Sequence, residues 1–347
     1  MSWGKKPGPP ADRVADRVAD RVIEQAAPVR IELLAGKLAA RIYRHEIESQ
    51  HGLIPCWSYV TEGLTGVQQA EVVFTLRRDP EDPSDGFPEE PLRLLASIHQ
   101  VTQTGQRVTS GSYTEFGDGG FLGHHVLYVR AQSLTGVRLP ASCLAALLVT
   151  ADELSAVREF GSTRVLARLG QASSHYPFPP WSDRRRRGLS LGRTLEASLL
   201  SRIPRASAHD VYVGVHDNQI TVAALRSEQP SWKERLAAVP EHVPLALLTA
   251  FDPEANGCLV WVPGQKGPEV LLPPGSDGAR ACGCFIVFLG EQAASGGKIL
   301  EDGLAMELTR EAWQAIRQAL LDGQELSIPA TGGGMSLALT WRNEVYV

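Results

Sequence analysis

The sequence lacks most of the features that mark an enzyme, a secreted protein or a membrane protein. It contains no H-E-x-x-H pattern and no P-loop, which favours assembly of any catalytic site from scattered residues. No stretch approaches about 18 uninterrupted apolar residues, and the N-terminus has no apolar segment of the kind found in signal peptides. We therefore expect a soluble cytoplasmic protein that makes no contact with a membrane.

Excess positive charge and a cysteine framework are also missing. Lys and Arg number 34 against 39 Asp and Glu, whereas a dedicated nucleic-acid-binding domain is usually strongly basic, so no nucleic-acid partner is expected. The five cysteines are odd in number and scattered, which excludes a disulfide scaffold. Cys258, Cys282 and Cys284 could supply three soft ligands, but no further His or Cys pair completes a zinc site nearby. We expect no metal, no cofactor and buried structural thiols.

The chain is too long for one ordinary core, because its 347 residues exceed the usual size of a single domain. Helical and strand patterns alternate along it, which predicts an α+β fold. We expect two lobes, each a mixed or antiparallel sheet packed with helices, joined by a Pro/Arg-rich linker. The predicted boundaries are an N-terminal extension that can form a helix at 1–27, an N-terminal lobe at 28–171, a linker or hinge at 172–209 and a C-terminal lobe at 210–347.

The pattern of the N-terminal lobe predicts a helix over residues 30–48, followed by an antiparallel pair of strands at 56–64 and 70–78. A second helix is expected at 90–105, strands at 106–116 and 124–132, and a further strand that leads into a helix after Thr150. Thr150 and Glu153 have the spacing of a capping box. In the C-terminal lobe, the turn "HDNQ" predicts a hairpin over 210–226, and 308–323 predicts a helix closed by Gly323.

The stretch "SHYPFPPWSDRRRRGLSLGR" at 174–193 sets three prolines and a tryptophan against four arginines. Adjacent arginines in an extended segment point to both sides, so a solvated linker is favoured over a phosphate-binding face. Tyr176, Phe178 and Trp181 have enough apolar area to anchor this segment against both lobes. We therefore interpret the stretch as a hinge whose arginines stay in water.

Two strand patterns carry a family resemblance. "CWSYVTEGL" and "AEVVFTLRR", followed by "PLRLLASIHQVTQTGQRVTSG", resemble the N-terminal domain of the Suppressor of Fused family over roughly residues 53 to 170. The matching positions are Trp57, Tyr59, Gly63, Leu64, Glu71, Phe74, Leu76 and Arg78. "MELTREAWQAIRQALLDG" is similar to the closing helix of that family's second lobe. The sequence resembles a compact bacterial-type member without the acidic insertion of the animal proteins.

The resemblance implies stoichiometric protein binding. Bacterial members are viewed as immunity or inhibitor proteins that neutralise toxins, and animal members sequester a Gli-type transcription factor, clamping an extended peptide between the lobes. "GQRVTSGSY" corresponds to the strand that carries the acidic residue of the animal clamp, and Gln106 stands at that position here. Strand alternation would place Arg107 and Tyr113 on the face that receives the ligand. The predicted partner-binding residues are Gln106, Arg107, Thr109, Gly111, Tyr113, Glu115 and Trp181.

The leading hypothesis is thus a non-enzymatic module without catalytic residues that binds a toxin or effector protein through the interlobe cleft. One alternative is a hydrolase or transferase whose cleft site uses residues such as Cys56, His99 and Glu115. Another is a scaffold subunit that docks through a helical arm at residues 11–25, where the repeat "ADRVADRVADRV" lies. The sequence specifies neither the identity of the partner nor the oligomeric state.

Overall fold

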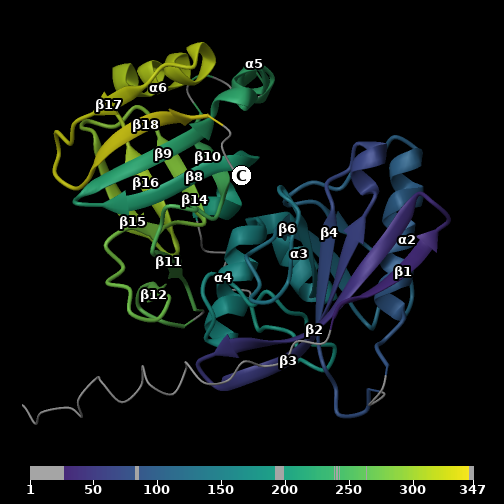
Figure 1. The fold of residues 1–347 in the computed structure, drawn as a ribbon. Coiled ribbons are helices and arrows are strands. Elements are labelled where there is room, and N and C mark those ends of the chain that lie inside the picture. Colours follow the sequence, from purple (N-terminus) through teal and green to yellow (C-terminus); the bar gives the residue numbers. More distant parts are fainter. Residues whose placement is uncertain are drawn as a thin grey trace, which may run out of the picture.

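The computed structural model describes residues 27–343, except for 83–85, 192–198, 238, 240, 242 and 263. The helical arm predicted at 11–25 lies outside the described residues, as does part of the predicted linker. Figure 1 shows two sheets side by side, with helices on their outer faces and between them. The predicted α+β fold with two lobes is confirmed.

The N-terminal lobe is built on a seven-stranded sheet with the order β1-β2-β3-β4-β7-β6-β5. All neighbouring strands are antiparallel except β4 and β7, which run parallel. The strands are β1 (Val29–Leu34), β2 (Leu38–Ser49), β3 (Gly52–Glu62), β4 (Val72–Arg77), β5 (Tyr113–Thr114), β6 (His125–Arg130) and β7 (Leu144–Val149), and a 3-10 turn, η1, spans Leu64–Val67.

Helices cover both faces of this sheet. Helix α2 (Glu90–Gln103) packs its buried Leu94, Leu95 and Ile98 on one face, and α3 (Ala151–Phe160) and α4 (Ser162–Ser173) pack on the other. The predicted pair of strands, β3 and β4, and the predicted helix α2 are confirmed. The capping box is also present: Thr150 Oγ1 accepts from the amide of Glu153, whose carboxylate accepts from the amide of Thr150.

The helix predicted over residues 30–48 is wrong, because this segment forms the hairpin of β1 and β2. Gly36 has a φ of 64° in the connecting turn, a conformation that suits glycine. In the second half of β2, His45 and Ile47 are buried while Glu46 and Glu48 are exposed, which is the period of a strand. Leu38, Ala39 and Ala40 are all buried, so both faces of the sheet are covered at the start of β2 and its alternation is hidden there.

The strand predicted at 106–116 is also largely wrong, because only Tyr113 and Thr114 pair in β5. A turn precedes them, closed by hydrogen bonds between Thr109 and Ser112. Gly111 has a φ of 86° at this turn, and its amide donates to the carbonyl of Tyr128. The turn interrupts the extended backbone, so the expected alternation of faces from residue 106 to 116 does not exist.

The C-terminal lobe contains an eleven-stranded sheet with the main order β12-β11-β13-β8-β10-β14-β16-β15, while β9 pairs with β8 and β18, and β17 with β18. Its strands are β8 (Arg205–His216), β9 (Gln219–Leu225), β10 (Leu245–Ala250), β11 (Gly257–Val260), β12 (Glu269–Leu271), β13 (Ala281–Cys282), β14 (Phe285–Leu289), β15 (Gly296–Leu300), β16 (Gly303–Glu307), β17 (Leu326–Ile328) and β18 (Ser336–Arg342). The predicted hairpin is confirmed, and Asp217 and Asn218 both have positive φ in its two-residue turn.

The outer face of this sheet is covered by α5 (Gln229–Ala237) and α6 (Arg310–Asp322). The 3-10 turn η3 (Leu199–Arg202) precedes β8, and η4 (Arg226–Glu228) leads into α5. Trp313 of α6 stacks on Phe288 of β14 with ring centroids 5.6 Å apart. Thr309 caps the start of α6 through the amide of Ala312, and Gly323 ends it with a φ of 67°. The predicted C-terminal helix and its glycine stop are confirmed.

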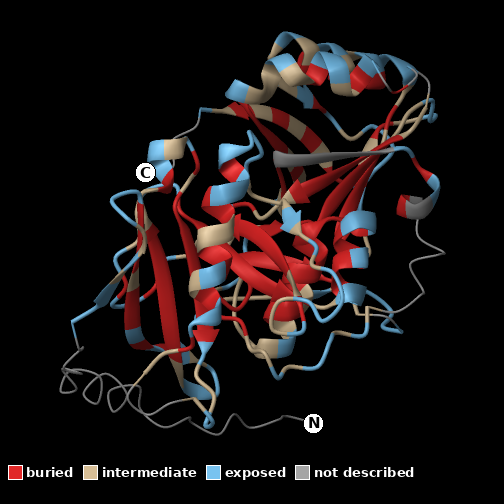
Figure 2. Ribbon diagram, turned by 90° about the vertical axis from the view of Figure 1, so that its right-hand side faces the viewer, coloured by how far each residue is buried: buried red, intermediate tan, exposed pale blue. Residues whose placement is uncertain are grey.

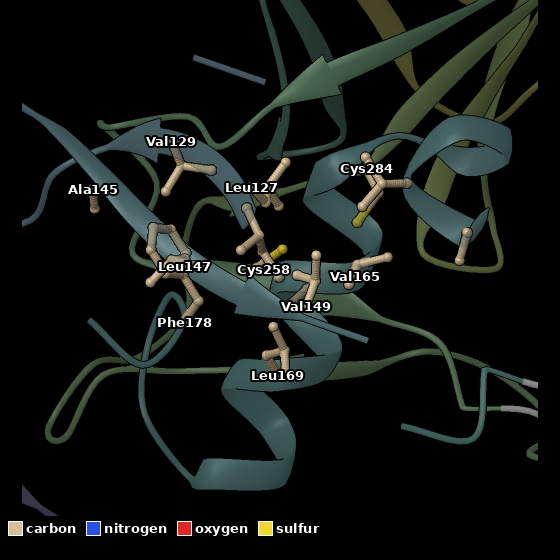
Figure 3. Close-up of a cluster of buried hydrophobic side chains, with 14 of the residues drawn as sticks. Leu127, Val129, Ala145, Leu147, Val149, Val165, Leu169, Phe178, Cys258 and Cys284 are labelled. Carbon is tan, nitrogen blue, oxygen red and sulfur yellow. The ribbon is translucent and has the colours of Figure 1, made fainter. Parts of the chain in front are cut away.

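A third core joins the two lobes. One face of the N-terminal sheet, α3, α4 and strands β10, β11, β13 and β14 contribute to a single buried cluster. In Figure 3, Leu127, Val149 and Val165 of the N-terminal lobe surround Cys258, which comes from the C-terminal lobe. Figure 2 shows that the strands of both sheets are mostly buried. The lobes therefore meet through a continuous apolar core, and α4 lies between their sheets (Figure 1).

The connecting segment, residues 174–191, is anchored against both lobes by Tyr176, Phe178 and Trp181, as predicted. Ser182 extends the N-terminal sheet: its amide donates to Thr75 O, its carbonyl accepts from the amide of Arg77, and its Oγ accepts from the amide of Leu148. Since the backbone of Ser182 joins the sheet ladder, the arginines that follow are held next to the acidic side chains of the N-terminal lobe.

Candidate functional site

A cleft of about 670 Å³ opens where the two lobes and the connecting segment meet, and we call it the interlobe cleft. Its N-terminal wall comes from the turn at Thr109, the end of β6 and the first turns of α4. Its C-terminal wall comes from β8, the end of β9 and the loop after β10. The residues that line it include Thr109, Ser110, Val129, Ala131, Gln132, Leu166, Tyr176, Pro177, Phe178, Tyr212, Leu225, Glu228, Ala250, Phe251, Asp252 and Ala255.

Aromatic side chains of the connecting segment form the floor between the walls. The hydroxyl of Tyr176 donates to the carbonyl of Ala255 at 2.9 Å, and the rings of Phe178 and Phe251 lie 5.6 Å apart. Gln132 Nε2 donates to the carbonyl of Phe178 at 2.8 Å. The segment is thus fixed to both lobes, which gives the cleft a preformed apolar floor.

The C-terminal wall also carries a compact charged cluster. Asp252 is buried, and its carboxylate accepts from Arg280 at 2.8 Å and from Arg342 at 3.0 Å. The guanidinium of Arg342 lies 5.4 Å from the ring centre of Tyr212. Both arginines also pair with Glu254. Because two arginines offset two carboxylates, this wall offers hydrogen-bonding groups without a large net charge.

The structure separates the residues predicted to bind a partner into four places. Thr109 lines the interlobe cleft, and Gly111 lies in the turn beside it. Tyr113 and Glu115 converge on Arg158 of α3, whose Nε donates to the hydroxyl of Tyr113 at 3.2 Å and which also pairs with Glu115.

Gln106 and Arg107 lie before the turn and are exposed, and Arg107 donates to the side chain of Gln68. Trp181 is buried and faces His175 edge-on at 5.0 Å. It lines another pocket, between the hairpin of β2 and β3, α4 and the connecting segment. Of the seven predicted residues, the structure therefore brings only Thr109 into the lining of the cleft.

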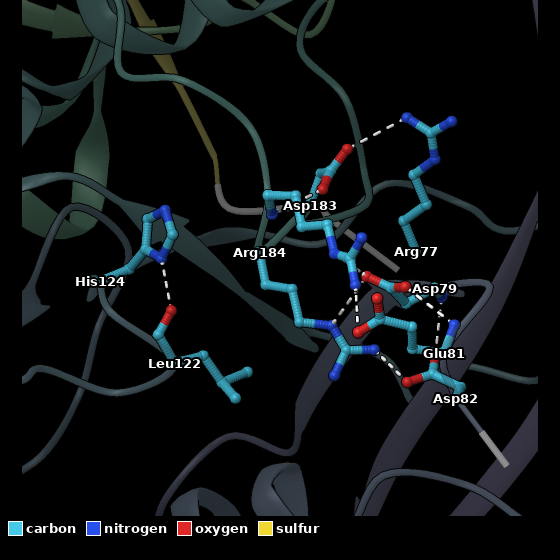
Figure 4. Close-up of polar contacts among 9 residues, drawn as sticks. Arg77, Asp79, Glu81, Asp82, Leu122, His124, Asp183 and Arg184 are labelled. Carbon is cyan, nitrogen blue, oxygen red and sulfur yellow. Dashed lines mark hydrogen bonds and ion pairs between the residues drawn. The ribbon is translucent and has the colours of Figure 1, made fainter.

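The prediction that the four arginines stay in water is wrong for Arg184 and Arg186, which are partly buried in ion pairs, while Arg185 and Arg187 are exposed. Figure 4 shows Arg184 paired with Asp82, beside the pair of Arg77 and Asp183. Arg185 contacts Asp79 and Glu81. These contacts fasten the connecting segment to the loop after β4.

Arg186 makes the most buried of these contacts. It pairs with Glu153, whose side chain has no exposed surface. Although burial alone would raise it, hydrogen bonds from Arg186 and from backbone amides hold the pKa of Glu153 below its usual range. Glu153 thus serves both as the helix cap and as the anchor of the connecting segment.

A second buried ion pair joins the lobes directly. Arg164 of α4 donates through Nε to Asp302 Oδ2 at 2.8 Å and through Nη2 to Glu301 at 2.9 Å. The side chains of Arg164 and Asp302 are only 3% and 1% exposed. Burial alone would lower the pKa of Arg164, but the carboxylate of Asp302 raises it above its usual value. These contacts hold α4 against the turn between β15 and β16.

The residues named for a hydrolase or transferase do not meet. Cys56 belongs to the core between the lobes, whereas α2, which carries His99, packs on the opposite face of the sheet. Burial raises the pKa of Cys56 to about 12, so its thiol is a poor nucleophile. Glu115 is exposed and pairs with Arg158.

Buried polar groups do occur in the core, but they are closed to substrates. His45 Nε2 and Ser58 Oγ lie 2.8 Å apart, and Ser58 in turn contacts Thr75 Oγ1 at 2.7 Å. All three side chains are buried. Within the described part of the chain, no group of three or more His, Cys, Asp or Glu is placed to hold a metal ion. Cys258, Cys282 and Cys284 are buried free thiols.

Sequence reasoning missed the C-terminal wall. Phe251 and Asp252 follow a strand directly, and an acid after a buried strand is a weak signal on its own. Tyr212 is one of many apolar residues of β8, and nothing in the pattern distinguishes it. Tyr176 and Phe178 were noticed only as anchors of the connecting segment, because their role in the cleft depends on residues about 75 positions further along the chain.

The fold and the cleft define a two-lobed α+β protein with a preformed groove between its lobes. The model of the family described as Smad anchor for receptor activation-like, C-terminal, matches residues 139–336. Since this is more than half of the chain, the protein belongs to that family. The matched range includes α3, α4, the connecting segment and most of the C-terminal lobe, and therefore most of the cleft.

Two curated relatives are similar over most of the chain. Zinc finger FYVE domain-containing protein 16 of Mus musculus is 25% identical over 78% of the chain, and zinc finger FYVE domain-containing protein 9 of Homo sapiens is 26% identical over 79%. These matches cover 19% and 20% of the two relatives. The chain thus spans about a fifth of the length of the curated relatives it matches.

Suppressor of Fused proteins, to which the sequence shows a resemblance, are among the solved structures found to be similar. Drosophila Suppressor of Fused has a TM-score of 0.40 and 12% identity, with coverage of 94% of this chain and 96% of that one. A chain of the Sufu-Fu complex has a TM-score of 0.37 and 19% identity, with coverage of 52% and 92%. At these TM-scores we draw nothing further from the likeness. No helix among the described residues has the length and apolar character needed to cross a membrane.

Proposed function

We propose that the protein is a binding module that holds another protein in its interlobe cleft without chemical turnover. The observation that carries this proposal is the cleft itself, whose apolar and aromatic lining comes from both lobes and the connecting segment. Aromatic side chains in such desolvated sites can each contribute about 2 kcal/mol or more to binding a protein partner. The cleft volume of about 670 Å³ also lies well within the range of ligand sites.

The relatives support protein binding in the same general sense. The family description names an anchor for Smad. The finer role stays part of the proposal: the module sequesters a toxin or effector as an immunity or inhibitor protein in the cytoplasm. The domain boundaries at 28, 172 and 210 likewise stay predictions.

We further propose that the partner enters as an extended segment beside the turn at Thr109. This turn precedes β5, which ends the N-terminal sheet, so its backbone lies next to an open sheet edge. An extended peptide can add to such an edge and place its side chains in the cleft. Of the predicted site residues, Thr109 and Gly111 are assigned to direct contact, and Tyr113 and Glu115 to holding the turn through Arg158.

The test uses site-specific photocrosslinking followed by affinity measurement. A benzophenone amino acid replaces Thr109 in the cleft or, as the control, Gln314, which is exposed on α6. We expect crosslinks to a partner only from position 109. Thr109→Arg should then lower the affinity of the purified partner by about tenfold or more, while Gln314→Arg leaves it unchanged.

Two results would contradict the proposal. Crosslinking from position 314 but not from position 109 would place the partner on another surface. Mass spectrometry of the partner after incubation separates binding from catalysis, because a hydrolase or transferase would change the partner's mass. A changed mass, with the change abolished by Thr109→Arg, would favour the enzyme instead.

A further inference from the structure

A second pocket of about 450 Å³ lies away from the interlobe cleft, and we call it the connector pocket. It is enclosed by the tip of the hairpin of β2 and β3, the end of β4, β7, the last turns of α4 and residues 179–189 of the connecting segment. Its volume is within the range of small-molecule sites. None of its lining residues lines the interlobe cleft.

The hairpin and α4 give the connector pocket a largely apolar wall. Leu53 and Ile54 come from β3, Leu169 from α4 and Trp181 from the connecting segment. Leu53 is 51% exposed, so it leaves apolar surface in water at the mouth of the pocket. A bound apolar group that covers Leu53 would remove this surface from water, which is favourable.

The end of β4 and the connecting segment give the pocket positive charge. Three arginines line it, of which Arg77 is neutralised by Asp183 and Arg186 by buried Glu153. The third, Arg187, is exposed, and no acidic side chain of the described residues forms an ion pair with it. The charge of Arg187 therefore remains available to a ligand at the rim.

We propose that the connector pocket binds an anionic amphiphile, a small molecule with an apolar chain and a single carboxylate group. The chain packs between Leu53, Leu169 and Trp181, and the carboxylate pairs with Arg187. Arg187 is the positive charge of this pocket that remains uncompensated, so it can balance one carboxylate of the ligand. A second carboxylate would find Arg77 already paired with Asp183 and would have no positive charge of its own. This site is independent of partner binding in the interlobe cleft.

The test uses dansyl-undecanoic acid as the probe for the intact chain. Trp181 lines the pocket, so excitation of tryptophan should transfer energy to the bound dansyl group, and Trp181→Phe should reduce that transfer. Dodecanoate should displace the probe. Dodecyltrimethylammonium, which has the same chain length and the opposite charge, should displace it at least about tenfold less well.

Two variants with matched controls locate the site. Ala172, on the last turn of α4, lines the pocket and is exposed. Ala172→Trp should therefore fill the entrance without disturbing the core, and it should lower the affinity for the probe by about tenfold or more. Arg187→Glu should lower the affinity for dodecanoate by about fivefold and leave the affinity for dodecan-1-ol unchanged. Gln314→Trp and Arg310→Glu make the same changes at exposed positions of the other lobe and should have no effect.

The proposal would be overturned if no saturable binding of the probe occurred up to about 0.1 mM. It would also be overturned if Ala172→Trp and its control, Gln314→Trp, bound the probe with the same affinity. A further contrary result would be loss of probe binding in Thr109→Arg, in the interlobe cleft, but not in Ala172→Trp. Binding of the cationic and anionic chains with equal affinity would refute the role of Arg187.

Discussion

The buried ion pair between Arg164 and Asp302 allows a direct test of how firmly the two lobes are joined. Asp302→Ala removes the carboxylate and leaves the guanidinium of Arg164 in a core where its side chain is 3% exposed. Removing one partner of such a pair typically lowers the free energy of unfolding by about 3 to 5 kcal/mol, because the remaining charge stays desolvated. Glu301 offers a second carboxylate to Arg164 at 2.9 Å, so we expect the lower part of this range, about 3 kcal/mol.

Urea denaturation measures this loss. With an m-value of about 3 kcal/mol per molar, the midpoint should fall by about 1 M. The exposed pair of Lys298 and Glu307 in the same hairpin of β15 and β16 is the control, and Lys298→Met should change the free energy of unfolding by less than about 1 kcal/mol. The double variant Arg164→Met with Asp302→Leu should be more stable than Asp302→Ala, since no charge then remains buried.

Hydrogen exchange adds the structural readout. Because one core contains residues of both lobes, amides of β7 and of β14 should lose protection in the same cooperative step. If Asp302→Ala cost less than about 1 kcal/mol, or if β7 and β14 opened in separate steps, the central core would not couple the lobes.

Three further predictions concern single buried groups. Arg186→Gln should lower the free energy of unfolding by about 2 to 4 kcal/mol, because it leaves the buried carboxylate of Glu153 unpaired. The control is Arg187→Gln at the next, exposed position, which should change the free energy of unfolding by less than about 0.5 kcal/mol in the same urea titration. Burial lowers the pKa of His45 below 6.5, so at acidic pH the unfolded chain binds more protons than the folded protein. The free energy of unfolding should therefore fall as the pH drops below about 6.5, with a slope of up to about 1.4 kcal/mol per pH unit from this residue. His45→Gln should flatten that part of the pH profile. A hydrogen bond with Cys258 lowers the pKa of Cys284 and burial raises it, and the net result is a rise to about 11. Ellman's reagent should therefore modify this thiol only after the protein unfolds. Rapid reaction of the native protein at neutral pH would show that the central core is open.

Local sequence signals determined the elements whose contacts are mostly close in the chain. The capping box of Thr150 and Glu153, the two-residue turn at Asp217 and the glycine stop of α6 each depend on a few neighbouring residues, and all were predicted. The alternating strand and helix patterns likewise gave the α+β class and the two lobes. The hairpin of β1 and β2 was mistaken for a helix because burial on both faces near Leu38 removes the alternation that identifies a strand.

Only the tertiary structure decided which residues form the cleft, the connector pocket and the junction between the lobes. Arg186 looked like one of four solvated arginines, and only folding places it within reach of Glu153, 33 positions earlier. Arg164 and Asp302 are 138 positions apart, and neither has a local pattern that marks it as buried. Burial and ion pairing depend on distances in space, and the sequence determines these only through the packing of the whole chain.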